Sequence, residues 1–324
     1  MTIQDTNTIT GDATITLNTE YKLWPNGGGL VHRSATVSES AYIEAGAIVG
    51  ADAVVESKAI VEFGARVEAR VCIAVTARVE AGAVVAEDVT IEAGATVGVN
   101  AKIGANTYIS HYARIGHHAE IGANAEIGSR CVVRHDAKVG AGTRLMGNII
   151  VPVGVESGAE CWLGHGAKIG AGSRLKNEFT LGHGAKLGAG TKVGAGAKID
   201  EGAKVGVKCL IGPNVFLDQR AEVGNHCHLY EGVYVGIDSV ICDGVKIGTD
   251  SKIMHDVEIG TDSVIDHDVT VGDKAYIGDN AKIGYSSAIG DEVTIGDNVT
   301  LPPRAFVADN ATVEVGVIIT DQDN

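Results

Sequence analysis

The stretch ARIGHHAEIGANAEIGSR at Ala113–Arg130 consists of three six-residue repeats, each with an aliphatic residue in its third place and a small residue in its first. The same pattern runs through 47 consecutive hexads from Ala35 to Gly316 without an insertion or a deletion. The third place holds Val, Ile or Leu in every hexad except at Ser157. Because neither an α-helix nor an ordinary strand has a period of six, the pattern indicates a solenoid.

Three hexads close one triangular coil of 18 residues, in which the third-place side chain points inward and the small first-place residue fits a corner. Glycine at the turns permits backbone angles that other residues avoid. Coils that stack at about 4.8 Å would form nearly 16 layers and a rod of about 75 Å. We therefore predict an all-β fold, a single-stranded parallel β-helix of about 16 coils with no helical domain.

The hexads of Ala113–Arg130 resemble those of the hexapeptide-repeat family, whose fold is a left-handed parallel β-helix. The resemblance extends over roughly nine-tenths of the chain. It implies the left-handed sense, which spacing alone does not, since parallel crossovers are otherwise nearly always right-handed. The segment WPNGGGLV at Trp24–Val31 resembles, more weakly, uncharacterised bacterial and phage hexapeptide proteins.

The unbroken register predicts one elongated unit over residues 35–319. Residues 1–34 are out of register and are expected to form a cap, because an open solenoid end exposes unpaired strand edges. They are alternatively a segment that attaches the rod to a larger protein assembly. Residues 320–324 form an acidic tail. Within the repeat, Ser157 and nearby Pro152 predict a local distortion, since proline donates no ladder hydrogen bond.

The net charge of −15 is concentrated near the C-terminus, where residues 231–324 hold 18 Asp and Glu against 5 Lys and Arg, a net of −13. This balance argues against nucleic acid as a partner. No stretch resembles a signal peptide or a membrane span, so we expect cytoplasmic synthesis without membrane insertion, and a place in the virion if the rod is a phage component. The six cysteines include no CxxC pair, and four occupy corner places, which favours small buried residues in a reducing compartment.

The second place of each hexad points outward, and every third hexad contributes to the same face. One face has only four charged residues among 16 and carries five aromatic residues: Tyr108, Trp162, Phe216, Tyr234 and Phe306. An apolar side of this length predicts an interface. Since hexapeptide proteins are typically trimers, the resemblance implies a homotrimer packed along this face; the alternative is a set of scattered surface aromatics.

Histidine followed by aspartate occurs at three corners, in VVRHDAKVG (Val132–Gly140), IMHDVEIG (Ile253–Gly260) and VIDHDVTVGD (Val264–Asp273). The last resembles the segment that carries the general base in the hexapeptide acyltransferases of lipid A synthesis. The resemblance implies His267 as a base that deprotonates an amine or hydroxyl attacking an acyl thioester, with His135 as second choice. Acyl-CoA or an acyl carrier protein would then be the donor.

Stacked polar corners raise the question of ions. His165 lies 18 residues before His183, and Asp273, Asp291 and Asp309 form a second column, so each set is expected to stack at one-layer spacing. Two imidazoles could share a cation, and stacked carboxylates could bind Ca²⁺. The alternative is solvated turn residues, and no metal site or cofactor is predicted with a defined ligand set.

Two functions remain on these grounds. An uninterrupted solenoid without loop insertions or a lid favours a non-enzymatic structural or binding protein, a rigid trimeric rod or decoration-type component of a phage particle or cell surface. The alternative is a hexapeptide-family acyltransferase that uses a corner histidine as general base.

Overall fold

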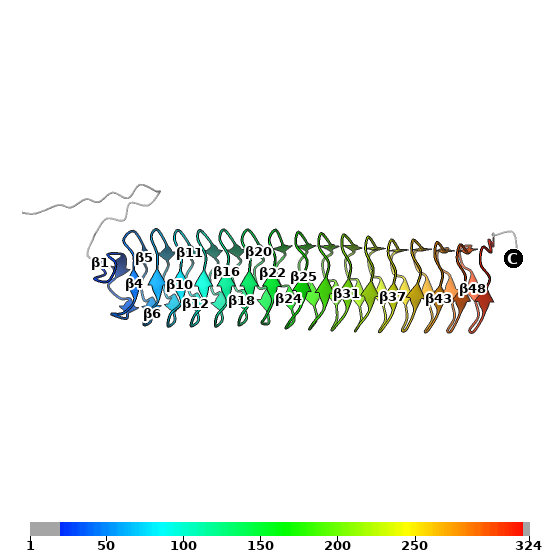
Figure 1. Cartoon of the computed structure of the whole chain (residues 1–324), viewed down its shortest axis with the longest axis horizontal. Helices are drawn as coiled ribbons and strands as arrows, with labels where there is room; N and C mark the ends of the chain where they lie inside the picture. Colours follow the sequence, from blue (N-terminus) through cyan, green and yellow to red (C-terminus); the bar gives the residue numbers. More distant parts are fainter. Residues whose placement is uncertain (1–19, 320–324) are drawn as a thin grey trace, which may run out of the picture.

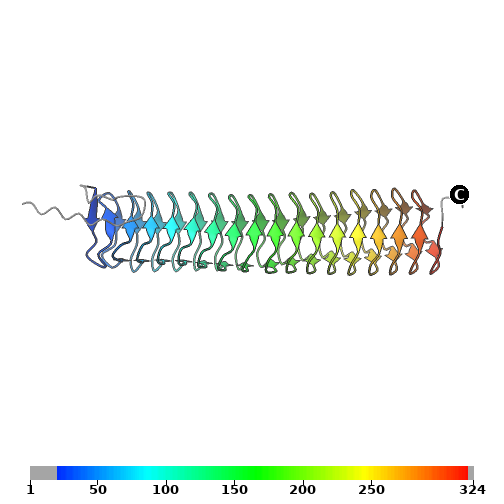
Figure 2. The same ribbon diagram turned by 90° about the horizontal axis from the view of Figure 1, so that it is seen from above.

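The computed structural model describes residues 20–319, which form a straight rod of stacked triangular coils (Figures 1 and 2). Two-residue strands begin every six residues from β3 (Thr36–Val37) to β49 (Thr312–Val313). The predicted fold class is confirmed: within these residues the chain is all-β, a parallel β-solenoid of about 16 turns. No helix in residues 20–319 is long and apolar enough to cross a membrane.

Each strand pairs in parallel with the strand one coil, or 18 residues, away, so that β4 (Tyr42–Ile43) places Tyr42 opposite Ile60 of β7 (Ile60–Val61). Three long sheets result. We call the sheet from β3 to β48 (Phe306–Val307) the apolar face, and the sheet from β4 to β49 the lysine face. The sheet that contains β5 (Ile48–Val49) and every third strand to β47 (Thr300–Leu301) is the charged face.

The core is a column of third-place aliphatic side chains lined at its corners by small first-place residues. Nearly all of these residues are fully buried. Serines in the first place keep their hydroxyls paired, as Ser263 Oγ donates to the Gly278 carbonyl at 2.8 Å. Phe179 is an exception to the small corner residues, because its fully buried ring occupies a first place. The packing therefore depends on aliphatic contacts between successive coils.

The corners impose a second pattern. The sixth place of each hexad adopts the left-handed conformation, as at Asp136 and Asp268, both with φ of 57°. Asn, Asp and Gly tolerate this region best, which explains their frequency there. In the fourth place, glycine allows coils to approach closely: a Cβ at Gly188 would lie 2.3 Å from the Gly206 carbonyl oxygen. The residue before each turn, the fifth, projects at the corner.

A hairpin covers the first coil. Strands β1 (Tyr21–Leu23) and β2 (Leu30–His32) are antiparallel, and β2 continues in parallel register with β5. The solenoid register therefore starts one hexad earlier than Ala35, at Gly29. Gly27 has a φ of +119°, and a Cβ there would lie 2.3 Å from the Ile43 carbonyl oxygen, so the turn between the strands requires glycine. The Trp24 indole N–H caps the Ala41 carbonyl at 3.0 Å.

The ladder is weaker around Ser157. Strands β20 (Lys138–Val139) and β23 (Glu156–Ser157) share a single residue pair, whereas neighbouring coils share two. The Gly140 amide donates to Ser157 Oγ at 3.1 Å instead of to a carbonyl of the next coil. The hydroxyl thus satisfies a ladder donor while it interrupts the aliphatic column.

Candidate functional site

Seven histidines occupy the fifth, projecting place of a hexad, and they lie at all three corners of the solenoid: His111, His117, His135, His165, His183, His255 and His267. The structure divides the best-defined of them into two classes by the partner of ring atom Nδ1. Which nitrogen carries the proton follows from that partner.

In the first class, Nδ1 accepts a hydrogen bond from the backbone of the preceding coil. Val99 N donates to His117, His165 N to His183 and Ile237 N to His255, at 3.0, 2.9 and 3.0 Å. An accepting Nδ1 carries no proton, so the proton of the neutral ring is on Nε2. These histidines extend the backbone ladder, and their outward nitrogen is a donor.

His135 and His267 form the second class. Their Nδ1 atoms pair with the carboxylate of the next residue, at 2.9 Å to Asp136 and 2.8 Å to Asp268. Since a carboxylate only accepts, Nδ1 carries the proton and Nε2 has a free lone pair. The hydrogen bond from His135 lowers the pKa of Asp136. Both rings are about half exposed, at 57% and 50%. This is the tautomer that a general base requires.

His267 has an additional support. Its ring stacks on the Tyr285 ring of the next coil, with centroids 5.0 Å apart and planes inclined by 4°. Asp268 is held by a 2.9 Å hydrogen bond from its amide to the Thr249 carbonyl. The imidazole is thus fixed by a carboxylate on its edge and an aromatic ring on its face, which sets the direction of Nε2.

Thr249 also lines a hollow of about 450 Å³ on the charged face. The hollow extends over β29 (Lys192–Val193), β32 (Leu210–Ile211) and β35 (His228–Leu229), and Tyr230 and Pro213 form part of its rim. It ends one coil before His267. An apolar floor with two lysines, Lys176 and Lys192, is therefore present next to the histidine.

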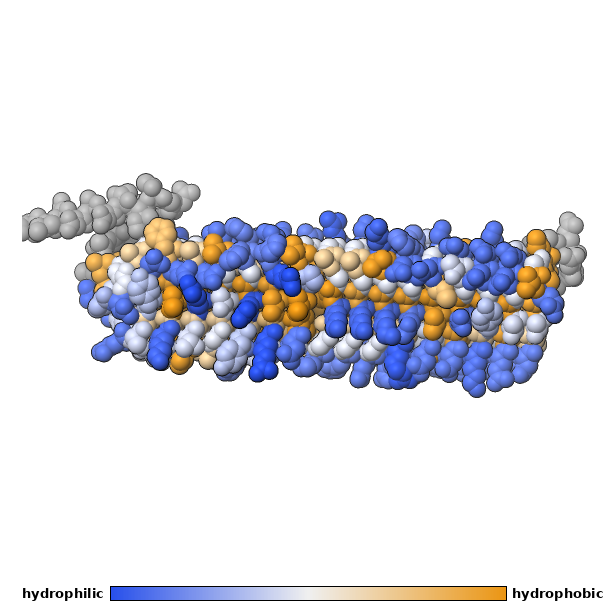
Figure 3. All heavy atoms as spheres, in the orientation of Figure 1, coloured by the Kyte–Doolittle hydropathy of each residue, from blue (hydrophilic) through white to orange (hydrophobic). Residues whose placement is uncertain are grey.

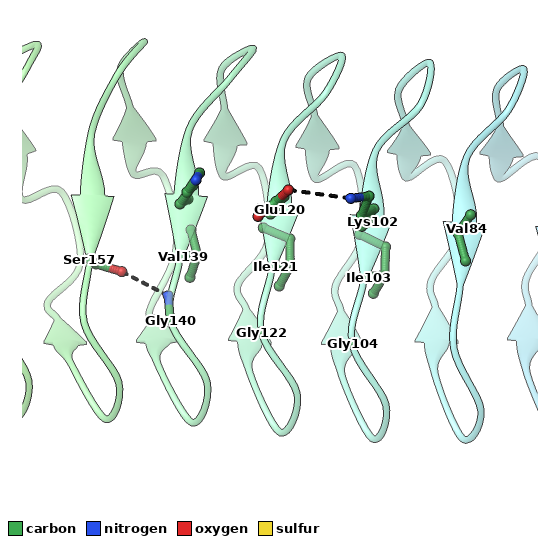
Figure 4. Close-up of a pocket in the computed structure, with 11 residues that line it drawn as sticks. Val84, Lys102, Ile103, Gly104, Glu120, Ile121, Gly122, Val139, Gly140 and Ser157 are labelled. Carbon is green, nitrogen blue, oxygen red and sulfur yellow. Dashed lines mark hydrogen bonds and ion pairs between the residues drawn. The ribbon is translucent and has the colours of Figure 1, made fainter.

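A second hollow, of about 550 Å³, lies on the same face between β11 (Val84–Val85) and β23 (Figure 4). Figure 4 shows Lys102 directed toward Glu120, 3.5 Å away, and Ser157 directed toward the Gly140 amide. Lys138, three residues after His135, also lines it. Both carboxylate-paired histidines therefore have a shallow apolar hollow nearby on the charged face, though neither ring lines one.

The stacked aspartates are explained by the same ladder that holds the first class of histidines. Asp291 Oδ1 accepts from the Asp273 amide at 2.8 Å, and Asp309 Oδ1 accepts from the Asp291 amide at 3.0 Å. The third member, Asp273, accepts from His255 N. His165 and His183 are joined by their backbone-to-ring hydrogen bond. Among residues 20–319, no group of three or more His, Cys, Asp or Glu side chains is arranged to hold a metal ion.

The aromatic residues of the apolar face are brought onto one sheet, but not into one cluster. Phe216 and Tyr234 are in contact, with ring centroids 5.6 Å apart, and the Tyr234 hydroxyl donates to Asp218 at 3.0 Å. Trp162 meets the His183 ring edge-on at 5.3 Å. Tyr108 and Phe306 stand apart from these, and Phe306 is 78% exposed. All six cysteines are free, and burial raises the pKa of the Cys131 and Cys161 thiols.

Two protein-family descriptions match the sequence. "Bacterial transferase hexapeptide (six repeats)" matches residues 100–135, and "GMPPB C-terminal domain" matches residues 211–318. The first match includes His135 and the second includes His267. No curated protein matches the chain.

Among solved structures, the acetyltransferase domain of PglB from Neisseria gonorrhoeae is 28% identical, with 40% of this chain and 53% of that one covered and a TM-score of 0.19. This chain thus spans about half of that domain. A UDP-N-acetylglucosamine acyltransferase from Campylobacter jejuni is 22% identical, with 61% and 70% covered and a TM-score of 0.20. GDP-perosamine N-acetyltransferase from Caulobacter crescentus is 22% identical, with 41% and 53% covered and a TM-score of 0.17.

The expectation of a non-enzymatic rod or phage decoration component is wrong. A matching family description names a transferase repeat, and the solved structures named above are acetyl- or acyltransferases. The regular surface suggested a purely structural role because the three His-Asp corners look equivalent in sequence. In the structure they differ, since only His135 and His267 are paired with their own aspartate and keep Nε2 unprotonated.

The fold agrees with the family match, because the six-residue coil of residues 100–135 continues through all three sheets. The resemblance inferred from the repeats is therefore confirmed, and the chain is a hexapeptide-repeat β-solenoid protein.

Proposed function

We propose that this protein is an acyltransferase in which His267 acts as the general base and an acyl thioester, acyl-CoA or an acylated carrier protein, is the donor. The observation that carries the proposal is the pairing of His267 Nδ1 with Asp268, which leaves Nε2 free to accept a proton. The match to a transferase hexapeptide repeat supports the same reaction class. His135, with its equivalent pairing to Asp136, is the second candidate.

The proposed reaction begins when an acceptor amine or hydroxyl donates a hydrogen bond to Nε2. Its lone pair attacks the thioester carbonyl carbon, the new N–C or O–C bond forms, and the proton passes to Nε2. Asp268 stabilises the resulting imidazolium through Nδ1–H, in the way that a carboxylate supports histidine in other acyl transfers. The tetrahedral intermediate then collapses, the C–S bond breaks, and the imidazolium returns the proton to the thiolate.

The hollow beside Thr249 offers space for part of a substrate. Its apolar floor would contact a flexible acyl or pantetheine chain, and Lys176 and Lys192 would interact with phosphate groups. A shallow hollow on a single chain leaves the ligand largely open to water. A neighbouring subunit would complete the enclosure that acyl transfer needs, and this links the chemistry to the oligomer.

We infer a homotrimer in which the apolar faces of three chains pack together. The support is the low charge of this face and the exposed rings of Tyr108 and Phe306. Closed cyclic symmetry would satisfy an extended apolar side with identical contacts from each chain. The measurement is the solution mass by light scattering, with Phe306→Asp expected to weaken the association. A wild-type mass of one chain at micromolar concentration would reject the trimer.

The catalytic proposal is tested by release of free CoA from acetyl-CoA in the presence of nucleotide-linked amino sugars as acceptors. His267→Ala is expected to lower the rate by about 10²- to 10⁴-fold, the usual contribution of a positioned general base. His255→Ala is the matched control, because its Nδ1 accepts a backbone N–H and the ring has no proposed part in the reaction.

The two histidines are separated by the same assay. Loss of activity in His135→Ala with full activity in His267→Ala would move the site to the first half of the rod. Full activity in the variant that lacks both rings would refute a histidine base. Wild-type protein that transfers no acyl group to any acceptor tested would refute the reaction class for those substrates, with folding verified by circular dichroism.

A further inference from the structure

The lysine face carries its outward residues in an order that is complementary to its own reverse. The relevant strands are β22 (Ile150–Val151), β25 (Lys168–Ile169), β28 (Lys186–Leu187), β31 (Lys204–Val205), β34 (Glu222–Val223), β37 (Val240–Ile241), β40 (Glu258–Ile259) and β43 (Tyr276–Ile277). We call this set the pairing strip. Its outward residues, in order, are Ile150, Lys168, Lys186, Lys204, Glu222, Val240, Glu258 and Tyr276.

The charges of the pairing strip are poorly satisfied within one chain. Lys168, Lys186 and Lys204 are exposed and stand directly opposite one another in adjacent strands. Like charges at facing positions of a sheet repel. Lys204 pairs with Glu222 at 2.5 Å, whereas Lys168, Lys186 and Glu258 form no ion pair with any residue of the described chain. An external partner would relieve this repulsion.

The strip also has apolar elements and a recess at its centre. Ile150, Val240 and Tyr276 are 48%, 37% and 40% exposed, high values for such residues on a sheet. A hollow of about 600 Å³ is lined by Lys186, Lys204, Glu222 and Val240, so its middle lies between β31 and β34. Figure 3 shows a row of hydrophilic side chains over the middle of this face, next to an apolar strip.

We propose that the pairing strip binds the same strip of a second copy of this chain, face to face and with the two rods antiparallel. The two-fold axis would run parallel to the strands, between β31 and β34. Lys204 then faces Glu222 of the second copy, and Lys168 faces Glu258 of the second copy. Ile150 meets Tyr276 of the second copy. Each contact occurs twice, which gives four ion pairs and two apolar contacts.

The order of charges selects this direction and register. Parallel rods would place Lys168 against Lys168, Lys186 against Lys186 and Lys204 against Lys204. Moving the axis by half a coil spacing, onto β31 or β34, would oppose Lys204 to Lys204 or Glu222 to Glu222. Only the axis between these strands opposes every acid to a lysine, and like-charge contacts suppress the other arrangements.

The size of the strip is sufficient for a modest interface. Eight strands at about 4.8 Å cover about 38 Å, and four extended residues give a width of about 13 Å. Two copies would therefore bury about 1,000 Å² in total, at the lower limit for specific association. This contact is separate from the apolar face and does not depend on the proposed acyl transfer.

The test uses two charge reversals, Lys168→Glu and Glu258→Lys. The two residues are five coils apart in one chain, so neither change alters an ion pair within the chain. Each variant alone would place like charges opposite each other twice, and its dissociation constant is expected to rise at least about tenfold. Sedimentation velocity in low salt, with one species fluorescently labelled, measures this association.

A mixture of the two variants provides the decisive comparison. A Lys168→Glu chain facing a Glu258→Lys chain regains both opposite-charge pairs, so the mixture is expected to associate within about threefold of wild type. Lys246→Glu, on the charged face, is the control and should associate like wild type. A mixture no tighter than either variant alone, or wild-type chains that associate no better than Lys168→Glu, would overturn the proposal.

Discussion

At the scale of single residues, the corner histidines show how one position serves two roles. A fifth-place ring can reach either the backbone N–H of the preceding coil or the carboxylate of its own neighbour. His255 takes the first option although Asp256 follows it, and His267 takes the second. In His255 the lone pair is used by the ladder, and in His267 it is left on Nε2. The chemistry of the corner therefore depends on ring orientation more than on residue type.

The phenol of Tyr234 gives a prediction for alkaline pH. Its partial burial and its hydrogen bond to Asp218 raise its pKa to about 12 from 10.0. Because the folded state holds the proton more tightly, the stabilising contribution is complete below about pH 10 and is lost as pH rises through about 12. Subtraction of the Tyr234→Phe titration, followed by phenolate absorbance, should isolate a transition near pH 12. A transition near pH 10 would contradict the environment described.

The aspartate ladder gives a second prediction at this scale. Asp291→Ala removes the acceptor for the Asp273 amide and should lower the unfolding free energy by about 0.5–1.5 kcal/mol. Asp291→Asn keeps an oxygen in the same place and removes one of three stacked charges, so it should be at least as stable as wild type at low salt. Urea denaturation of both variants decides. Equal destabilisation by Asn and Ala would mean that the charge itself is required.

At the scale of elements, Ser157 is a polar interruption of the aliphatic column. Ser157→Val should add about 1 kcal/mol to the unfolding free energy, because burial of the side chain outweighs the loss of the Gly140 contact. The change is measured from urea midpoints. Thr270→Val, on an exposed second place of β42 (Thr270–Val271), is the control and should change stability by less than about 0.5 kcal/mol. A destabilised Ser157→Val protein would show that the hydroxyl is needed.

The elements also show what the sequence could and could not predict. The third-place column predicted the strands and their register, since only one spacing buries Val37, Ile43 and their successors together. The first hexad, with Val31 in its third place, was missed because the glycines before it conceal the repeat. The division of the histidines could not be predicted, because two hydrogen bonds of similar strength compete for each Nδ1. The confirmation that comes from pattern therefore covers the fold and not the site.

At the scale of the whole molecule, charge is unevenly distributed along the rod. Residues 231–324 carry 18 acidic and 5 basic residues, whereas residues 161–210 carry three acidic and eight basic ones. Self-repulsion should therefore weaken the last coils most at low ionic strength, when the screening length is about 30 Å. Neighbouring coils are stabilised mainly by each other, so this weakness should be local.

Hydrogen exchange measures this local effect. Raising salt from about 10 mM to about 150 mM shortens the screening length to about 8 Å and should slow amide exchange in residues 231–319. Exchange in residues 35–130, which carry less net charge, serves as the internal reference and should change less. A uniform change along the rod would indicate a general effect of salt on hydrophobic burial instead of relief of repulsion.

The 18-residue coil makes the length of this molecule a matter of arithmetic. Removing or duplicating 18 residues keeps every downstream side chain on its own face, whereas a change of six keeps the core intact but turns everything beyond it by one third of a revolution. Such a change would move His267 to another edge and separate the lysines from the acids of the lysine face. The chain is thus a graduated ruler, on which lineages can gain or lose whole marks and still read the same scale.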